Sequence, residues 1–362
     1  MLKLESVHKT FGDIQAVQNL DLAINEKEIF VLLGPTGAGK TTTLKIAAGL
    51  VKPERGRVLI ENNEVTQVPA AFRNISFVFE SYNLFPIYNV YENIAFALKS
   101  KLYRQDKAEI EKRIRFVSQD LHISHLLDRE ISTLSGGEVQ RVALARALVR
   151  QAKINLFDEP LSNLDLKLRE ELRVEFKELQ KKYQATIFYV THDHDSAVSI
   201  ADRIGILFEG VLYQVDTPDN LSNNPNNIIV ATLINYPAVN IIECFLRDQT
   251  IYMGTNTSLV ALSDPEIAAI RKQTSENEFQ IAIKPQAIRI GKHEHYIHFA
   301  GKFLHVEYQG YNKVVDLDLE GFIIRALTTE NIHSTFGTTI DISFSKGDLF
   351  LFNKRDGKRI IL

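Results

Sequence analysis

The chain carries Gly34-Pro35-Thr36-Gly37-Ala38-Gly39-Lys40-Thr41, which has the residue types and the spacing of a phosphate-binding loop. The loop lies between an apolar segment, Ile29–Leu33, which has the pattern of a buried strand, and a helical pattern that begins at Thr42. Small residues let successive backbone N–H groups converge on phosphate oxygens, and the positive end of the following helix adds its field. The sequence therefore predicts a nucleotide site at this loop, rather than a glycine-rich turn without a ligand.

Two side chains of the loop are candidates for direct contact with the nucleotide. Lys40 would reach the β- and γ-phosphates, and the hydroxyl of Thr41 would ligate Mg²⁺. These roles belong to a nucleoside triphosphatase, but they do not say which kind. That depends on motifs further along the chain.

A second motif, Leu134-Ser135-Gly136-Gly137-Glu138, precedes a helical pattern over residues 139–148. A Ser-Gly-Gly turn at a helix start presents backbone donors and a positive dipole to an anion, so it suits a second phosphate clamp. A helix that Ser135 merely caps is the alternative, and for the motif alone it would be preferred. Three further segments favour the phosphate clamp: Phe157-Asp158-Glu159-Pro160, Leu161-Ser162-Asn163-Leu164-Asp165 and Tyr189-Val190-Thr191-His192-Asp193. In this order, the motifs of the chain resemble those of the ABC ATPase family.

The resemblance gives the later motifs chemical roles. Asp158 would hold Mg²⁺ through water, and Glu159 would polarise the attacking water. His192 resembles the family's switch histidine, which contacts the γ-phosphate and orients the water, although a lone histidine is more often structural. Asp165 resembles the residue through which one subunit's loop reaches the other's site. Phe11 matches the aromatic residue on which adenine stacks, whereas without the family match it would be assigned to the core.

The same resemblance implies a dimer. Each ATP would lie between the phosphate loop of one copy and Ser135 and Gly137 of another, and closing and opening of the pair would be a population shift driven by the γ-phosphate. The expected cofactors are ATP and Mg²⁺. The expected nucleotide contacts are Phe11, Gly34, Pro35, Thr36, Gly37, Ala38, Gly39, Lys40, Thr41, Thr42, Glu80, Ser135, Gly136, Gly137, Glu138 and Asp165, with Thr41, Glu80 and Asp158 at the metal and Glu159 and His192 in catalysis.

Three positions depart from the family pattern. Glu80 stands where the family normally has glutamine; its carboxylate could ligate Mg²⁺ or could repel the γ-phosphate. We expect a working site, because Mg²⁺ would offset much of the repulsion. Glu138 replaces the commoner glutamine of the second motif, a milder change. Asn155 stands in the strand before Asp158 where an apolar residue is usual, and a buried amide needs partners.

Composition agrees with this class of protein. The chain has 362 residues, enough for two or three domains, and a formal net charge of −3, which gives no overall attraction to nucleic acid. No segment is long and apolar enough to span a bilayer, and residues 1–7 lack the apolar core of a signal peptide. The single cysteine, Cys244, fits a reducing compartment. We expect a cytoplasmic protein, bound peripherally to the inner face of the cell membrane.

The pattern of strands and helices predicts two domains. Residues 1–235 are expected to form an α/β P-loop NTPase domain with a mixed, mainly parallel sheet and a helical subdomain at about 81–155. Within that subdomain, Ile110, Ile114 and Val117 recur on one helical face. Residues 236–362 read as all-β, with alternation over 315–319 and 340–344, and suggest a small OB-type barrel. This part resembles the C-terminal regulatory domain of bacterial importer ATPases of the maltose and glycerol-3-phosphate type.

The expected function is that of the ATP-hydrolysing subunit of a bacterial ABC importer for a carbohydrate or a glycerol phosphate, with polyamines as another class of solute. Its expected partners are integral membrane permease subunits, a solute-binding protein and a second ATPase chain, identical or related, and no nucleic acid. One alternative, motivated by Glu80 and Asn155, is a regulatory subunit that hydrolyses little ATP and pairs with an active ATPase. Another is a soluble ABC ATPase that works outside transport.

Overall fold

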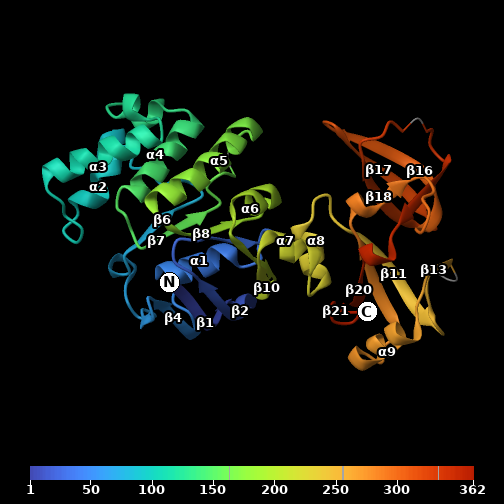
Figure 1. The fold of residues 1–362 in the computed structure, drawn as a ribbon. Helices are drawn as coiled ribbons and strands as arrows, with labels where there is room; N and C mark the ends of the chain where they lie inside the picture. The colour runs from blue at the N-terminus through green and yellow to red at the C-terminus, as the bar shows by residue number, and fades with distance from the viewer. Residues whose placement is uncertain (163, 255–256, 333) are drawn as a thin grey trace. The chain divides into compact units, whose positions relative to one another are not determined.

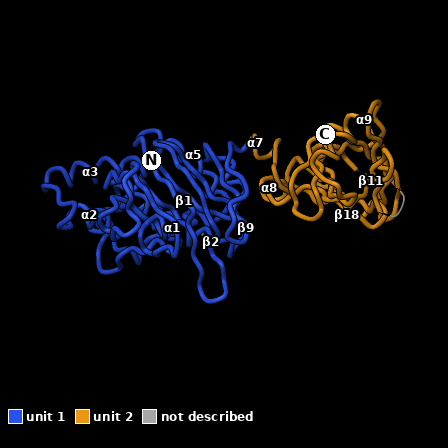
Figure 2. Tube along the Cα trace, turned by 90° about the horizontal axis from the view of Figure 1, so that it is seen from below, with its two compact units in different colours: residues 1–218 blue, residues 219–362 orange. Residues whose placement is uncertain are grey.

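The computed structural model describes residues 1–162, 164–254, 257–332 and 334–362. The chain forms two compact units, Met1–Pro218 and Asp219–Leu362 (Figure 2). The boundary predicted from the sequence, 235/236, lies later in the chain. Helix α8 (Ile228–Ile234) belongs to the second unit because its Ala231 packs in an apolar cluster with Phe350 and Phe352.

The phosphate loop follows one of the two central strands of a six-stranded sheet, whose strands β6, β7, β8 and β10 are labelled in Figure 1. The strand order is β10-β9-β3-β8-β7-β6; all neighbours run parallel except β10, which is antiparallel to β9. Parallel strands place their carboxyl ends at the same edge, so the segments that follow β3, β7 and β8 meet there. The strands are β3 (Ile29–Leu33), β6 (Ile75–Val78), β7 (Ile154–Asp158), β8 (Thr186–Thr191), β9 (Arg203–Phe208) and β10 (Val211–Asp216).

A second, antiparallel sheet completes the layers around helix α1 (Lys40–Ala48). Its order is β2-β1-β4-β5, formed by β1 (Leu2–Phe11), β2 (Ile14–Ile24), β4 (Arg55–Ile60) and β5 (Asn63–Glu64). Leu44 and Ile46 of α1 lie in one apolar cluster with residues of both sheets. Burial of this helix between two sheets fixes the start of α1, and with it the phosphate loop.

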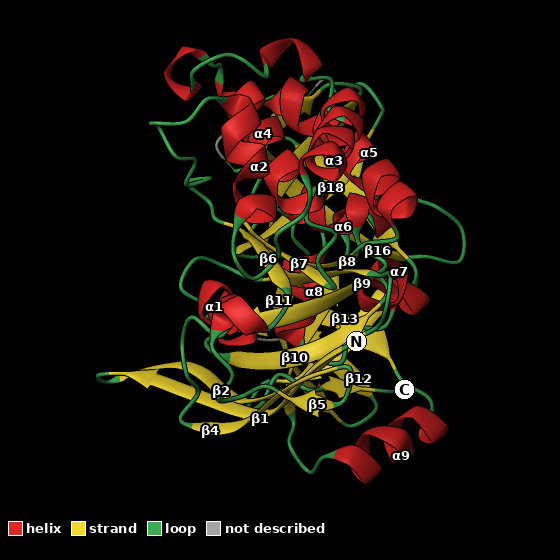
Figure 3. Ribbon diagram, turned by 90° about the vertical axis from the view of Figure 1, so that its left-hand side faces the viewer, coloured by secondary structure: helices red, strands yellow, loops and turns green. Residues whose placement is uncertain are grey.

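The helical subdomain contains α2 (Val90–Lys99), α3 (Lys107–Asp120) and α4 (Gly136–Leu148), followed after β7 by α5 (Leu166–Tyr183). Figure 3 shows these helices grouped on one side of strands β6, β7 and β8. The predicted apolar face of α3 is confirmed, because Ile110, Ile114 and Val117 are all buried. Asp106 caps α3 by accepting a hydrogen bond from the backbone N–H of Glu109.

The second unit is all-β apart from short helices, as predicted, and its strands form two antiparallel sheets that share one core. Ile242 and Phe279 of one sheet and Val315 and Phe344 of the other lie in this core, with Ile270 of α9 (Asp264–Gln273). The first sheet, in the order β13-β12-β11-β14-β20-β21, consists of β11 (Asn240–Arg247), β12 (Thr250–Met253), β13 (Thr257–Ala261), β14 (Glu278–Ile283), β20 (Leu349–Asn353) and β21 (Arg359–Ile360). The second, in the order β15-β19-β16-β17-β18, consists of β15 (Arg289–Ile290), β16 (Ile297–Gln309), β17 (Asn312–Leu319), β18 (Phe322–Thr328) and β19 (Thr339–Phe344).

None of the helices in the part of the chain that the structure describes combines the length and the apolar character needed to cross a membrane.

Candidate nucleotide-binding and hydrolysis site

The phosphate loop depends on glycine at its last position before the helix. Gly39 has φ +102° and ψ 4°, and a Cβ added there would lie 2.0 Å from the carbonyl oxygen of Ala16 in β2. The carbonyl of Gly39 accepts hydrogen bonds of 2.9 Å from both the backbone N–H and the hydroxyl of Thr43. Helix α1 therefore begins at Lys40, two residues before the predicted start, and its N-terminal N–H groups face the loop.

Lys40 and Glu159 lie together at the carboxyl edge of the sheet. The ammonium of Lys40 donates hydrogen bonds to the carbonyls of Gly34 (2.9 Å) and Pro35 (3.0 Å), and it lies 3.5 Å from Oε1 of Glu159. Burial lowers the pKa of Lys40, and the carboxylate of Glu159 opposes this shift. The buried ammonium would gain from an anion at the loop, because it lies in a poorly solvated site.

Thr41 and Asp158 form a pair of oxygen ligands. The hydroxyl of Thr41 donates a 2.8 Å hydrogen bond to Oδ1 of Asp158. Burial raises the pKa of Asp158; the bond from Thr41 and the charge of Lys45 oppose the shift, whereas Glu159 and Glu80 add to it. Glu80, two residues beyond β6, is therefore close enough for its charge to act on Asp158, although its own side chain is exposed.

This donor set fits Mg²⁺. A hydroxyl, a carboxylate and the negative field of two further carboxylates suit a hard cation that prefers oxygen. The described residues contain no group of three or more histidine, cysteine or acidic side chains arranged to hold a metal. Mg²⁺ commonly takes one or two protein ligands and completes its shell with water and substrate phosphates, so a partial protein shell is what a Mg²⁺–nucleotide site requires.

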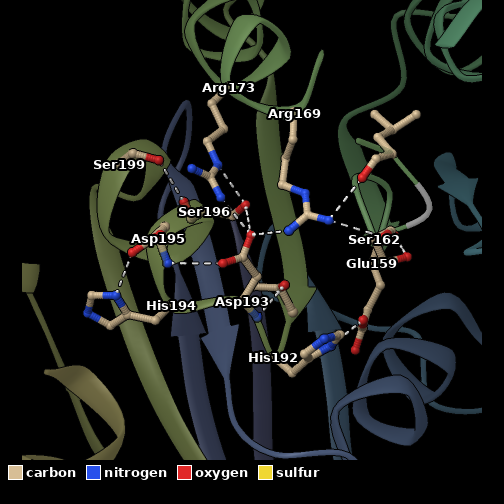
Figure 4. Close-up of polar contacts among 12 residues, drawn as sticks. Glu159, Ser162, Arg169, Arg173, His192, Asp193, His194, Asp195, Ser196 and Ser199 are labelled. Carbon is tan, nitrogen blue, oxygen red and sulfur yellow. Dashed lines mark hydrogen bonds and ion pairs between the residues drawn. The ribbon is translucent and has the colours of Figure 1, made fainter. Parts of the chain in front are cut away.

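His192 contacts Glu159 directly. Its Nδ1 lies 2.5 Å from Oε2 of Glu159 (Figure 4). Glu159 follows β7 with φ +45°, and its backbone N–H donates to the carbonyl of Val190 in β8 at 3.0 Å. The two neighbouring parallel strands thus bring the histidine and the carboxylate together. The side chain of Glu159 is only 12% exposed, whereas that of His192 is 51% exposed.

Sequence reasoning missed the polar cluster behind His192. Asp193, the cap of helix α6 (His194–Ile200), accepts hydrogen bonds at Oδ2 from Arg173 (2.7 Å) and from the hydroxyl of Ser196 (2.5 Å). Burial acts to raise the pKa of Asp193, but the bonds from Ser196 and Arg173 outweigh it and keep the pKa below its ordinary value. Arg169, one turn before Arg173 on α5, also lies 3.7 Å from Asp193 (Figure 4).

The second motif is a capped helix start. The hydroxyl and backbone N–H of Ser135 donate to Oε2 of Glu138 at 2.9 Å and 2.7 Å, and the backbone bond is the main cause of the lowered pKa of Glu138. Gly136 has open space where a Cβ would lie, whereas a Cβ on Gly137 would lie 2.4 Å from Cδ2 of Leu168 in α5. Within the described residues, no hydrogen bond or ion pair joins this motif to the phosphate loop of the same chain.

The remaining predicted residues are spread over the first unit. Phe11 is 49% exposed at the end of β1, with the ammonium of Lys9 5.1 Å from its ring centre. Asp165 caps α5 by accepting from the backbone N–H of Leu168 at 3.0 Å. Asn155 is buried in β7, and its Oδ1 has no hydrogen-bond partner in the described part of the chain.

Other predicted contacts lie along the loop and the start of α1: Thr36 and Gly37 are exposed, Ala38 is buried and Thr42 is half-buried. Asn163 lies outside the described residues.

The fold and the site define a P-loop nucleoside triphosphatase: a phosphate loop runs from β3 into α1, and acidic residues follow the neighbouring strand β7. The family model described as "ABC transporter" matches residues 17–162. Together with its full-length relatives, this match shows that the chain belongs to the ATP-binding proteins of ABC transporters, and it is an ABC transporter ATPase.

Relatives of known name are similar over both units. The chain is 36% identical to the trehalose/maltose import ATP-binding protein of Thermococcus litoralis, over 99% of each chain. It is 33% identical to the spermidine/putrescine import ATP-binding protein of Clostridioides difficile, over 98% of this chain and 99% of that one. Among solved structures, the dimeric structure of MJ0796, a bacterial ABC transporter cassette, has 33% sequence identity and a TM-score of 0.55, covering 60% of this chain and 98% of that one.

Proposed function

We propose that this chain is the ATP-hydrolysing subunit of an ABC importer. The observation that carries the proposal is the cluster of Lys40, Glu159 and His192, in which one carboxylate lies 3.5 Å from the ammonium and 2.5 Å from the imidazole. A phosphate anchor, a base and a histidine that can orient water are the groups that phosphoryl transfer to water requires. Import as the purpose rests on the full-length relatives, which are named as import ATP-binding proteins.

In this proposal the loop binds the triphosphate and the next residues hold the metal. Backbone N–H groups at the start of α1 and the ammonium of Lys40 would neutralise the β- and γ-phosphates. Thr41 and Asp158, with Glu80 nearby, would hold Mg²⁺, which supplies charge neutralisation at the transferred phosphoryl group. Phe11, exposed at the end of β1, offers a ring face for stacking with adenine.

Glu159 and His192 would act on the attacking water. The carboxylate of Glu159 accepts a proton as the water attacks, and the imidazole of His192 fixes the position of the carboxylate and reaches the γ-phosphate. Because Glu159 is mostly buried and held by its backbone bond to Val190, little reorganisation is needed before reaction.

A second ATPase chain would complete the site. Ser135 and Gly137 of one copy would face the phosphate loop of another. Asp165 would lie in the segment through which one copy reaches the nucleotide site of the other. This arrangement is supported by the lack of contact between the two motifs within one chain and by the likeness to a dimeric cassette. The pair would bind permease subunits on the cytoplasmic face of the membrane, and a solute-binding protein would deliver the solute.

We propose a carbohydrate or a glycerol phosphate as the solute. The trehalose/maltose relative matches at 36% identity over nearly the whole of both chains, and the sn-glycerol-3-phosphate import protein of Psychromonas ingrahamii matches at 40% over 71% of this chain and 69% of that one. A polyamine is the other class to test, because spermidine/putrescine relatives match over a similar length.

The test is to tag the chain in its native cell, extract the membranes with mild detergent and identify the proteins that co-purify. Permease subunits should be recovered, and reconstituting them with this chain should give ATP-dependent uptake that Lys40→Ala abolishes. Uptake of labelled maltose, glycerol 3-phosphate and spermidine would then identify the class of solute. Recovery of the chain without any membrane protein would contradict the importer, and uptake of spermidine alone would contradict the proposed solute class.

A further inference from the structure

The contacts around Glu159 and His192 form a closed ring that includes Arg169. One terminal nitrogen of Arg169 donates to the carbonyl oxygens of Leu164 (3.0 Å) and Ser162 (3.4 Å), and the other lies 3.7 Å from the carboxylate of Asp193. Ser162, in turn, donates through its hydroxyl to the carbonyl of Glu159 at 2.9 Å. Asp193 directly follows His192, whose imidazole contacts Glu159, so the ring closes (Figure 4).

Asp193 is fixed more firmly than a helix cap requires. Besides capping α6 through the backbone N–H of Asp195 at 3.1 Å, its carboxylate binds Arg173 and Ser196, and its own backbone N–H donates to the hydroxyl of Thr191 at 2.9 Å. These contacts restrain the backbone on both sides of the residue. Since His192 lies between Thr191 and Asp193, the contacts of Asp193 restrain the backbone from which the imidazole reaches Glu159.

The environment of Arg169 indicates a role beyond stability. Its Nε is buried and has no hydrogen-bond partner within the described residues, a feature that costs free energy. Unpaired buried polar atoms of this kind are expected at functional sites, where the required positions of side chains leave some hydrogen bonds unmade. Arg173, on the same face of α5, binds only Asp193 and Ser196 among the described polar contacts, whereas Arg169 also holds the segment that follows Glu159.

We infer that Arg169 is a positioning residue for ATP hydrolysis, which sets His192 against Glu159 by binding Asp193 on one side and the carbonyls of Ser162 and Leu164 on the other. The guanidinium suits this task because its planar fork can serve two acceptors in different directions, which the single ammonium of a lysine cannot do as well. The inference rests on the proposed function, since it assigns Glu159 and His192 their part in hydrolysis.

The test is a double-mutant cycle on the full chain with Mg²⁺–ATP. Arg169→Gln should lower kcat about 10- to 100-fold, as small displacements of reacting groups do, while KM changes less than about threefold. In a His192→Ala background the same substitution should lower single-turnover rates less than about twofold, because the group through which Arg169 acts is gone. Arg169→Lys should recover part of the lost kcat, since it keeps the charge beside Asp193.

Controls separate this inference from the proposed function. Arg271→Gln is the matched control, because Arg271 of α9 in the second unit also donates to backbone carbonyls, those of Ser275 and Glu276. The kcat of the Arg271→Gln variant should equal that of the wild type. Equal losses from Arg169→Gln with and without His192 would overturn the positioning role, as would an unchanged kcat. If Glu159→Gln also left turnover intact in the same assay, the proposed function itself would fail.

Discussion

Replacing Gly39 by alanine should destabilise the first unit and disable the phosphate loop. At φ +102° an L-residue is strained by about 1–2 kcal/mol. The added Cβ would lie 2.0 Å from the carbonyl oxygen of Ala16, so β2 and the start of α1 must separate by more than 1 Å. Overpacking of this kind costs about 1–3 kcal/mol, which gives a total loss of about 2–5 kcal/mol in the free energy of unfolding.

The change would also move the groups that bind phosphate. The carbonyl of Gly39 accepts from the backbone and the hydroxyl of Thr43, so displacement of this residue shifts the first turn of α1 together with Lys40. A misplacement of about 1 Å at a reacting centre can lower the rate about 100-fold. We therefore expect turnover of ATP by Gly39→Ala to fall by at least that factor.

Gly37→Ala is the matched control for stability. Gly37 has φ +83°, but a Cβ added there would have no heavy atom within 4 Å. Only the conformational strain remains, so the expected loss is about 1–2 kcal/mol. Urea unfolding of the two variants and the wild type measures the difference. If Gly39→Ala were no less stable than Gly37→Ala, the close contact with Ala16 would not have the assigned effect.

Two further predictions concern single carboxylates. Glu80→Gln should change ATP turnover less than about tenfold, because the metal offsets the charge that Glu80 places near Asp158; a rise of tenfold or more in a steady-state assay would mark the site as attenuated. Hydrogen bonds from Lys346 and then Ser263 lower the pKa of Glu266 from its ordinary value of 4.5 to about 2, so the stabilisation by its ionised form is complete above pH 4.5 and is lost as the pH falls towards 2. The free energy of unfolding of Glu266→Gln, measured by urea at several pH values, should therefore approach that of the wild type between about pH 5 and about pH 3, and a constant difference would contradict the assigned contacts.

The sequence was most informative where a motif fixes both residue type and spacing. Strand Ile29–Leu33 is confirmed with the predicted bounds, and the strand expected before Asp158 is confirmed as β7. Parallel strands leave few arrangements for the segments at their carboxyl ends, so the proximity of Glu159 and His192 follows from the order of the motifs once the family is recognised. The apolar face of α3 followed from helical periodicity.

Other features depend on tertiary contacts that no local pattern reveals. Arg169 and Arg173 look like ordinary charges on a solvated helix; their spacing of four residues places them on one face, but only the fold brings that face to Asp193. The predicted boundary at 235/236 differs from the division of the structure at 218/219, because the short helix Ile228–Ile234 has no pattern that says which unit it packs against. Asn155 remains without an explanation, since its Oδ1 is buried and lacks a partner in the described residues.

The most direct test of the hydrolytic site is release of phosphate by the purified full-length chain with Mg²⁺–ATP, measured for the wild type and for Glu159→Gln. The proposed site predicts a fall in kcat of at least about 100-fold for the variant, with binding of ATP retained, because Lys40 and the loop are unchanged while the base is lost. Turnover by Glu159→Gln at the rate of the wild type would contradict the role of Glu159 and, with it, the mechanism built on its contacts with Lys40 and His192.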